Sequence, residues 1–494
     1  MTGAKTGALW GLLGILMAGC GGGSEAVVVH GATIFDGTGS PALENAEMVI
    51  VDGRIRCIGE TGDCARPGSF DDVAAAGFWI VPGLIDTHMH AFFGSNPDQA
   101  WRDERLRFLL GVTTTRDGST RRNHAANIEA AARSSDAELP VPRLYVAGRV
   151  GPAAATDARA AAAAVRGLAE SGAASIKVKD AYPLAVLEAI RSSARELGLS
   201  VWGHAFEDGT VRRLRLEALP AGYDGVAHLI GVAAHAVPDS VLAAPPGELG
   251  DPAWKIWDRS LWGRADTARL DGLARDLAAM VWLEPLLVVE EQWSEPYGLP
   301  PGLHRLAELP AVVTGIATPE GIPERSESDF ERLRESAEVM RRFVRTFHEA
   351  GGVVVTGTDG ALAPGLSLQE EIKALVRAGF SNEAALMAAT SAAAEVIGAS
   401  DSLGTLEPGK LADFVVLEGD PLADIRNIEL VSRVAKGGVL HDPSTLFDQL
   451  KDDVGASSTP PSRRVLIGLV AVAIVVTLTV VAIVRHSRRG KGRV

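Results

Sequence analysis

The chain is poor in cysteine and has no excess of basic residues. It contains 3 cysteines among 494 residues, and 62 Asp and Glu against 48 Lys and Arg give a formal net charge of -14 at pH 7. A protein that binds nucleic acid needs a basic surface, so this balance argues against a nucleic-acid partner. No internal repeat is evident. A hydrophobic fraction of 47% and a charged fraction of 22% exclude a disordered or fibrous chain and allow a large buried core.

The few cysteines occur in two different settings. Cys20 ends the segment LMAGC, which resembles a bacterial lipobox, so we expect Cys20 to be the lipid-modified first residue of a lipoprotein. Cys57 and Cys64 lie close together in RIRCIGETGDCAR. They either form a disulfide or are two unpaired small residues of a β-rich segment, and the sequence leaves both alternatives open.

Both ends of the chain predict membrane attachment. Residues 1–19 have one basic side chain and an apolar stretch too short to span a bilayer, which is typical of a signal peptide, and residues 20–25 would form a flexible tether. Ordinary signal-peptide cleavage nearby is the alternative to lipidation. Residues 465–484 carry no charge and are long enough for a transmembrane helix, with a stalk at 443–464 and a basic cytoplasmic tail at 485–494. This topology predicts a location at the bacterial cell membrane, with the main part of the chain extracytoplasmic, either periplasmic or at the cell surface.

Between the two ends, short apolar runs alternate with helical segments. Such alternation is typical of a parallel βα architecture. Strands are predicted near 111–116, 142–147, 174–178, 200–204, 225–229, 281–289 and 353–358, and helices at 157–171, 183–197, 264–279 and 326–350. Residues 232–262 form the longest irregular connection, which we expect to lie over the strand ends and to shape a pocket. Residues 26–82 and 411–440 differ, because their β-branched runs separated by Gly and Asp turns predict a sheet.

Potential metal ligands stand where several apolar runs end. His88 and His90 are two residues apart, and alternate residues of a strand project from one face, so both side chains can reach one ion. Similar positions follow at the ends of later runs: Lys177, His204, His228 and Asp359. In (β/α)8 barrels this end of the strands holds the active site. The sequence therefore predicts a metal site assembled from several strands.

The motifs VPGLIDTHMH, GVTTTRD, SIKVK, GTDG and GTLEPGKLADFVVLEGDPL, in this order, are similar to those of the amidohydrolase superfamily. SIKVK and PGLSLQEEIKALVRAGFSNEAALMAATSAAAEVIG resemble in particular its bacterial prolidase and imidazolonepropionase-related group. The resemblance implies an α/β fold with a (β/α)8 TIM-type barrel over 83–400. It also implies a small discontinuous β-sandwich from 26–82 and 401–442, to which the sequence adds the C-terminal transmembrane helix.

The same resemblance implies an enzyme. Its reaction would be hydrolysis of a C–N amide bond in a dipeptide or cyclic amide by a metal-bound hydroxide, with Asp359 as general acid and base. The cofactors would be two divalent metal ions, Zn²⁺ by the nature of the ligands, bridged by Lys177 after its carboxylation. The implied metal ligands are His88, His90, Lys177, His204, His228 and Asp359.

Some features leave alternatives open. Glu207 forms an HxxE pattern with His204, which resembles the mononuclear deaminases, where this glutamate is the proton shuttle. Lys179 lies on the same strand face as Lys177 and is the alternative inward lysine. The stretch 360–365 lacks the histidine that many dipeptidase-like members carry after the aspartate, which leaves the substrate open. A surface binding protein without catalysis is the third hypothesis, but it would be expected to lack one or more ligands.

Three further residues have supporting roles in this interpretation. Arg116 and Asp117 end a predicted strand, and we expect them to support the site without touching a metal. Tyr223 precedes another strand and is either a substrate contact or a tyrosine of the core or surface.

Overall fold

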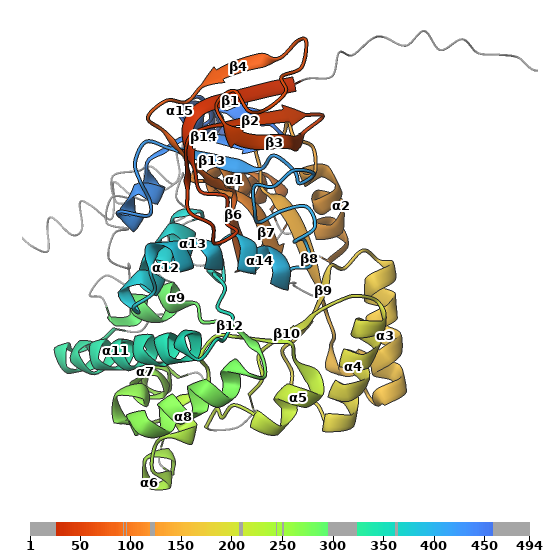
Figure 1. Cartoon of the computed structure of the whole chain (residues 1–494). Coiled ribbons are helices and arrows are strands. Elements are labelled where there is room, and N and C mark those ends of the chain that lie inside the picture. Colours follow the sequence, from red (N-terminus) through yellow and green to blue (C-terminus); the bar gives the residue numbers. More distant parts are fainter. Residues whose placement is uncertain are drawn as a thin grey trace, which may run out of the picture.

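Figure 1 shows the computed structural model of the chain. The structure describes residues 26–91, 93–94, 96–118, 124–206, 211–243, 245–248, 251–294, 324–360 and 364–457. The predicted signal peptide, Cys20, the tether, Glu207 and the predicted transmembrane segment 465–484 lie outside the described residues.

The larger part of the structure is an α/β barrel. Its parallel sheet has 7 strands in sequence order: β6 (Leu84–Met89), β7 (Val112–Asp117), β8 (Arg143–Arg149), β9 (Ser175–Val178), β10 (Val201–Gly203), β11 (Gly225–Ala227) and β12 (Trp282–Glu284). In place of the predicted strand at 353–358, Val354 forms one parallel bridge with Leu283 of β12. The carbonyl of Thr356 then accepts a hydrogen bond from the Thr87 N–H of β6. This short segment connects β12 to β6 and completes the ring.

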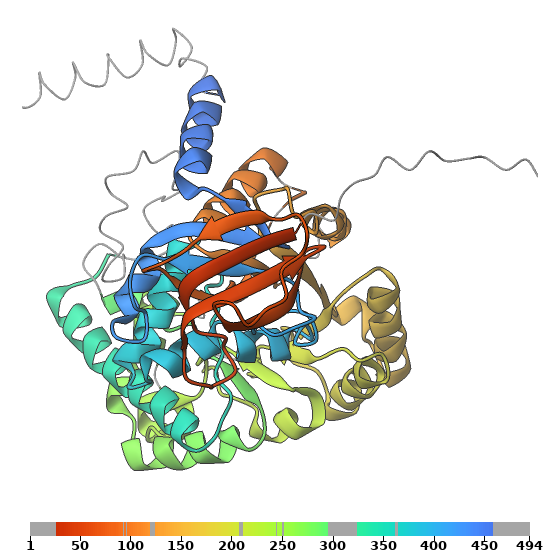
Figure 2. The same cartoon turned by 45° about the horizontal axis from the view of Figure 1, so that its top comes forward.

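Helices surround the barrel on its outer side (Figure 2). Buried apolar residues such as Leu187 and Ile190 of α4 face the strands, as expected of amphipathic helices. The longer helices are α1 (Pro97–Leu109), α2 (His124–Ser134), α3 (Ala158–Glu170), α4 (Leu184–Glu196), α8 (Thr267–Ala278), α11 (Glu327–Glu349) and α12 (Leu366–Arg377). The shorter ones are α5 (Leu219–Gly222), α6 (Asp239–Leu242), α7 (Pro252–Ser260), α9 (Leu287–Glu291), α13 (Asn382–Ala388) and α14 (Ser391–Val396).

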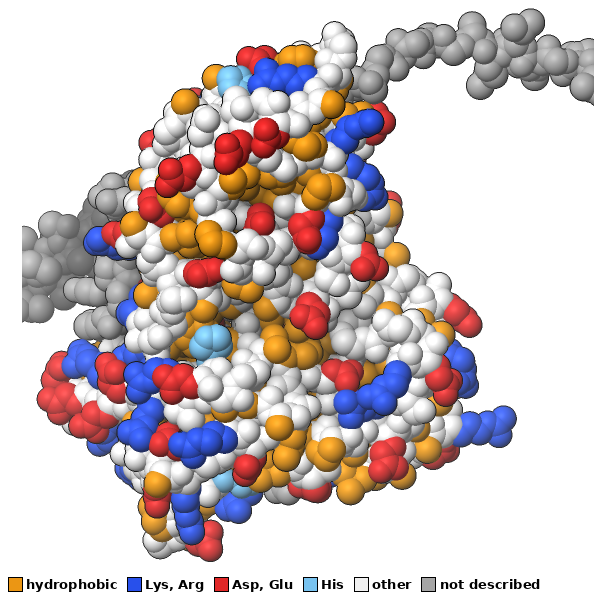
Figure 3. Space-filling model, in the orientation of Figure 1, with side chains coloured by type: hydrophobic (Ala, Val, Ile, Leu, Met, Phe, Trp, Pro, Cys, Tyr) orange, Lys and Arg blue, Asp and Glu red, His pale blue; other side chains and the backbone are white. Residues whose placement is uncertain are grey.

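Charged residues of both signs are mixed on the face shown in Figure 3. Lys and Arg side chains there lie next to Asp and Glu, most densely around α11 and its neighbours. Arg342 of α11, for example, pairs with Asp271 of α8 at 2.7 Å. The described side chains of this face therefore form no continuous basic surface.

Two segments differ from the sequence-based expectation. The predicted strand 281–289 ends at Glu284, because Leu286 adopts a left-handed φ of 52° and α9 begins after it. The Glu371 carboxylate accepts hydrogen bonds from the N–H groups of Leu287 (3.0 Å) and Val288 (2.6 Å), which satisfies the first donors of α9. Residues 232–262, expected to be irregular, contain α6 and α7.

The smaller part is a sheet above the barrel (Figure 1). Its 8 strands are β1 (Ala26–Ile34), β2 (Leu43–Val51), β3 (Arg54–Glu60), β4 (Asp71–Ala74), β5 (Trp79–Pro82), β13 (Phe414–Leu417), β14 (Val431–Lys436) and β15 (Val439–His441). Antiparallel pairing of β13 with β5 joins the C-terminal strands to the N-terminal ones. The result is one connected sheet, where the sequence predicted a sandwich. Cys57 and Cys64 form a disulfide within it, which decides the alternative left open above.

Three charged side chains connect the sheet to the barrel, and we call them the latch: Lys436, Arg143 and Asp413. Arg143 of β8 donates two hydrogen bonds to Asp413, of 2.6 and 3.1 Å. The ammonium of Lys436 donates to the carbonyls of Ser134 (3.1 Å), Leu139 (2.6 Å) and Val141 (2.8 Å). Because these partners belong to the barrel side of the chain, the latch fixes the sheet on the barrel.

The membrane part of the predicted fold class is wrong. No helix in the described part of the chain is both long and apolar enough to cross a bilayer. We therefore correct the fold class: the described residues form an α/β barrel with an attached sheet, and none of their helices is a transmembrane helix. The predicted location, with an extracytoplasmic catalytic domain at the bacterial cell membrane, rested on this helix and on the N-terminal segment, and it does not stand, because the described residues contain no membrane-spanning helix. Where a stalk was expected from residue 443, the structure has helix α15 (Pro443–Ser457).

Candidate metal centre

The predicted ligands come together at one end of the barrel. His88 lies near the end of β6, and Lys177 lies in β9. His204 and His228 directly follow β10 and β11, and Asp359 follows the segment that closes the ring. Because the strands are parallel, their carboxyl ends meet at the same end of the barrel.

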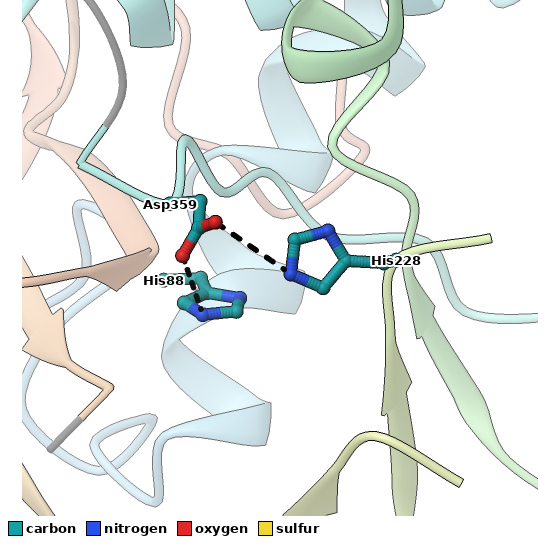
Figure 4. A group of neighbouring side chains, drawn as sticks. All are labelled: His88, His228 and Asp359. Atoms are coloured by element: carbon teal, nitrogen blue, oxygen red, sulfur yellow. Dashed lines mark ion pairs between the residues drawn. The ribbon is translucent and has the colours of Figure 1, made fainter. Parts of the chain in front are cut away.

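Asp359 is the centre of the cluster. Its Oδ1 lies 3.3 Å from His88 Nε2 and 3.1 Å from His90 Nε2, and its Oδ2 lies 3.8 Å from His228 Nε2. Figure 4 shows the carboxylate between the rings of His88 and His228. One ligand atom from each of His88, His228 and Asp359 lies within 4.8 Å of the others, a spacing that could hold one metal ion.

The remaining two predicted ligands border this cluster. Lys177 Nζ lies 2.7 Å from His88 Nε2. The ring of His204 stands edge-on to that of His228, with 5.0 Å between centroids. Lys177 is buried and Lys179 is exposed, so of the two lysines it is Lys177 that lies at the site.

The backbone at two ligands is strained, and a glycine beside the cluster leaves space open. His228 and Asp359 have left-handed φ values of 64° and 55°, which are costly for residues other than glycine and often occur at functional sites. A Cβ at Gly118 would lie 2.8 Å from Lys177 Nζ, 3.0 Å from His90 Cε1 and 3.1 Å from His88 Cδ2. Glycine at this position therefore leaves open a space that any side chain would fill.

Burial sets the charge of the site. It lowers the pKa of His88 and His204 well below the usual value, with help from the charges of Lys177 on His88 and of His228 on His204. It also lowers the pKa of His228. Neutral imidazole is the form that binds metals. For Asp359, burial favours the acid form, but the hydrogen bond from His90 and the electrostatic effect of the surrounding histidine rings outweigh burial and lower its pKa.

A charged group behind the site was not found by sequence reasoning. Glu284, at the end of β12, is fully buried, and its Oε2 lies 2.9 Å from His88 Nδ1. Arg116 donates to the other oxygen of Glu284 at 2.9 Å and to the carbonyl of Thr87 at 2.6 Å. The one available signal was a carboxylate inside the apolar run WLEPLLVV.

The supporting residues occupy definite places. The carboxylate of Asp117 accepts hydrogen bonds from the Ala91 N–H (3.1 Å) and the Asn127 amide (2.7 Å) and lies 4.0 Å from His90 Nδ1. Tyr223 is buried and donates to the carbonyl of His204 at 3.3 Å, so it is a core tyrosine. Neither Asp117 nor Tyr223 belongs to the group of potential metal ligands formed by His88, His228 and Asp359.

Comparisons with known proteins agree with this geometry. The model of the amidohydrolase family matches residues 79–440. An imidazolonepropionase of Pseudomonas putida strain F1 is 28% identical over 427 residues, covering 80% of this chain and 93% of the relative. An imidazolonepropionase of Pseudomonas fluorescens strain Pf0-1 is 26% identical over 445 residues, covering 83% and 97%.

Solved structures show the same fold. A putative prolidase from Bifidobacterium longum superimposes with a TM-score of 0.59 at 23% identity, covering 87% of this chain and 99% of that one. A bottromycin amidohydrolase gives 0.62 at 22% identity, covering 88% and 92%. A Xaa-Pro dipeptidase with bound methionine gives 0.59 at 19% identity, covering 85% and 100%.

Proposed function

The chain belongs to the amidohydrolase family and is a metal-dependent hydrolase of C–N amide bonds, and from this premise we propose that it holds two divalent metal ions bridged by a carboxylated Lys177. The observation that carries the proposal is the position of Lys177 Nζ, 2.7 Å from His88 Nε2 in the ligand cluster. We propose Zn²⁺ as the ion, because imidazole and carboxylate ligands suit it.

The residues fit such ions. The buried imidazoles are in the neutral form that can donate a lone pair to a metal, and Asp359 remains a carboxylate beside them. The space left by Gly118 borders Lys177, His90 and His88. In our proposal His88, His90 and Asp359 would hold one ion, His204 and His228 would hold the second, and the modified Lys177 would be a ligand to both.

The modification gives the lysine a charge that suits the site. A buried ammonium beside two cations is electrostatically unfavourable. The ammonium first loses one proton, the Nζ lone pair then forms a bond to the carbon of CO₂ while one C–O π bond becomes a lone pair on oxygen, and the nitrogen loses a second proton. The side chain thereby changes from a cation to a carbamate anion. Burial lowers the pKa of Lys177 to about 8, which raises the share of the unprotonated amine that this step needs.

The side chains have complementary tasks in catalysis. When bound, the metal ions supply an activated water and polarise the carbonyl of the scissile amide. Asp359 accepts the proton of the attacking water on a carboxylate oxygen and delivers it to the leaving nitrogen. Its Oδ1 lies 3.1 Å from His90 Nε2, so the two proposed ligands of one ion are already close together.

The proposed substrate is a dipeptide or a cyclic amide. Cyclic amides are supported by similarity to imidazolonepropionases over most of their length. Dipeptides are supported only at the level of the fold, through the prolidase-like structures. The alternative residue for deaminase chemistry, Glu207, lies outside the described residues.

The test uses the purified full chain. It is stripped of metal with a chelator, reloaded with Zn²⁺ in the presence or absence of bicarbonate, and analysed for bound metal and for hydrolysis of a panel of dipeptides and imidazolone-type cyclic amides. We expect two Zn²⁺ per chain, recovery of activity that depends on bicarbonate, and hydrolysis of either the dipeptides or the cyclic amides. One metal per chain with recovery independent of bicarbonate would overturn the bridged site and favour the deaminase.

A further inference from the structure

Glu284 stands at an unusual place for a carboxylate. It lies in the last position of β12 and is fully buried in the barrel wall. Its Oε2 and the Nδ1 of His88 lie 2.9 Å apart. The two atoms form an ion-pair contact, and neither has a hydrogen-bond partner among the described residues.

The remaining atoms around Glu284 fix the direction of its carboxylate. Its Oε1 accepts hydrogen bonds from Arg116, at 2.9 Å, and from the hydroxyl of Thr87. The guanidinium of Arg116 is itself held 3.7 Å above the ring of Trp202 and donates to the carbonyl of Thr87 at 2.6 Å. These contacts hold Oε1, while Oε2 lies against Nδ1 of His88.

The packing also requires this arrangement. A Cβ at Gly357 would lie 2.8 Å from the Cβ of His88 and 3.1 Å from the Cγ of Glu284. The closing segment of the barrel therefore approaches both side chains as closely as a glycine backbone permits. Gly357 and Arg116 therefore both restrict where the side chain of Glu284 can lie relative to His88.

We propose that Glu284 is a positioning residue that keeps the imidazole proton of His88 on Nδ1, so that Nε2 presents its lone pair to the metal. The inference rests on the proposed function, because it takes His88 as a metal ligand. The second nitrogen of a metal-binding histidine is generally held by a carboxylate or carbonyl, which fixes the tautomer and raises the basicity of the ligand. Here Nε2 is the atom that faces both Lys177, at 2.7 Å, and Asp359, at 3.3 Å.

The experiment measures the affinity of the metal-free full chain for Zn²⁺, by competition with a chelator that forms a coloured complex. Glu284→Gln keeps the size of the side chain but removes its charge, and we expect the affinity to fall by about 10- to 100-fold. Glu284→Asp should recover part of the loss. Arg116→Lys, which loses the fork that orients Glu284, should shift the affinity in the same direction by a smaller factor.

The latch offers a matched control. Asp413 is also buried and also accepts two hydrogen bonds from an arginine, Arg143. Asp413→Asn should lower the thermal unfolding midpoint as Glu284→Gln does, yet leave the Zn²⁺ affinity at the wild-type value. Equal affinities in Glu284→Gln and wild type, or equal losses in Glu284→Gln and Asp413→Asn, would overturn the inference.

A third variant separates this inference from the proposed function. His88→Ala should lose Zn²⁺ binding. Wild-type affinity in His88→Ala would contradict both the proposed function and the inference. Loss of binding in His88→Ala together with full binding in Glu284→Gln would leave the proposed function intact and reject the role of Glu284. If Glu284→Gln does not fold, the Zn²⁺ affinity of Arg116→Lys is used in its place, and a wild-type affinity in that variant would reject the role of Glu284.

Discussion

Lys177 in the metal centre and Lys436 in the latch are both buried lysines, but their surroundings differ. Their exposed fractions are 2% and 0%. Burial lowers the pKa of each side chain to about 8. The ammonium of Lys436 is surrounded by three carbonyl acceptors of the barrel. The close polar neighbour of Lys177 is instead an imidazole nitrogen, that of His88.

The hydrogen-bond partners of a buried lysine therefore indicate its role. Three carbonyls satisfy all three donors of an ammonium, so Lys436 is stable as a cation and holds the structure together. A basic ring nitrogen cannot do the same for Lys177 while it also serves a metal. A buried lysine among imidazoles is therefore suited to modification, and one among carbonyls is suited to a structural task.

The largest expected effect comes from Lys177→Ala. Without the bridging group, the full chain should bind fewer Zn²⁺ ions, and loss of one ion removes several kcal/mol of transition-state stabilisation, or about a thousandfold in kcat/KM. The thermal unfolding midpoint of the metal-free protein should change little. Metal analysis, hydrolysis rates and calorimetry provide the three readouts, and wild-type turnover in this variant would show that Lys177 is not part of the mechanism.

Lys436→Met should have the opposite profile. Methionine fills most of the same volume but leaves the carbonyls of Ser134, Leu139 and Val141 without their donor. Unsatisfied buried groups of this kind typically cost about 1–3 kcal/mol each, and partial rearrangement should limit the total loss in unfolding free energy to about 2–4 kcal/mol. Chemical denaturation measures the loss. Zn²⁺ content per folded chain should remain that of the wild type, and a fall in content would mean that the two regions are coupled.

The sequence predicted the convergence of the ligands and indicated Arg116 and Asp117 as supporting residues, but it did not predict Glu284. His88, Lys177 and His228 each stand at the end of an apolar run, and parallel strands bring such ends together whatever the loops do. Glu284 and His88 are in contact although 196 positions separate them in the sequence, so no local pattern identifies Glu284 as a partner of His88. The same holds for Glu371, which turns the predicted strand after Glu284 into α9.

Other differences have equally physical causes. Val354 makes only one bridge, so a β-branched run there gives closure of the ring without a strand. The pairing of Cys57 with Cys64 depends on how β3 and its following loop fold, which spacing alone does not determine. The predicted transmembrane helix rested on an uncharged run followed by basic residues, which lies outside the described residues, and no helix among the described ones is long and apolar enough to cross a membrane.

A smaller effect on the metal centre is expected from Gly118→Ala. The new methyl group would take up the space next to Lys177 Nζ and the rings of His88 and His90. Because the lysine end can shift while the rings cannot, we expect Zn²⁺ affinity and kcat/KM to fall by about 10- to 100-fold, as for a displaced ligand partner. Gly167→Ala in α3 is the control, since its Cβ meets nothing within 4 Å. Equal metal affinity in both variants would contradict the role of Gly118.

The smallest expected effect is a pH dependence of the latch. His441 lies beside it, with its Nε2 3.0 Å from the carbonyl of Ala137, and burial together with the charge of Lys436 lowers its pKa. A lowered pKa in the folded state means that the unfolded chain binds the proton more tightly. Stability is therefore full above the unfolded pKa of about 6.5 and is lost as the pH falls from there through the folded pKa.

The variant His441→Gln should remove this dependence. The side chain is partly exposed, so screening by solvent keeps the expected effect below about 1 kcal/mol between pH 7.5 and 5.5. The measurement compares thermal unfolding midpoints of the metal-free wild type and variant at both pH values, because metal release at low pH would otherwise dominate. An identical acid shift in the two proteins would mean that the proton is taken up by a group other than His441.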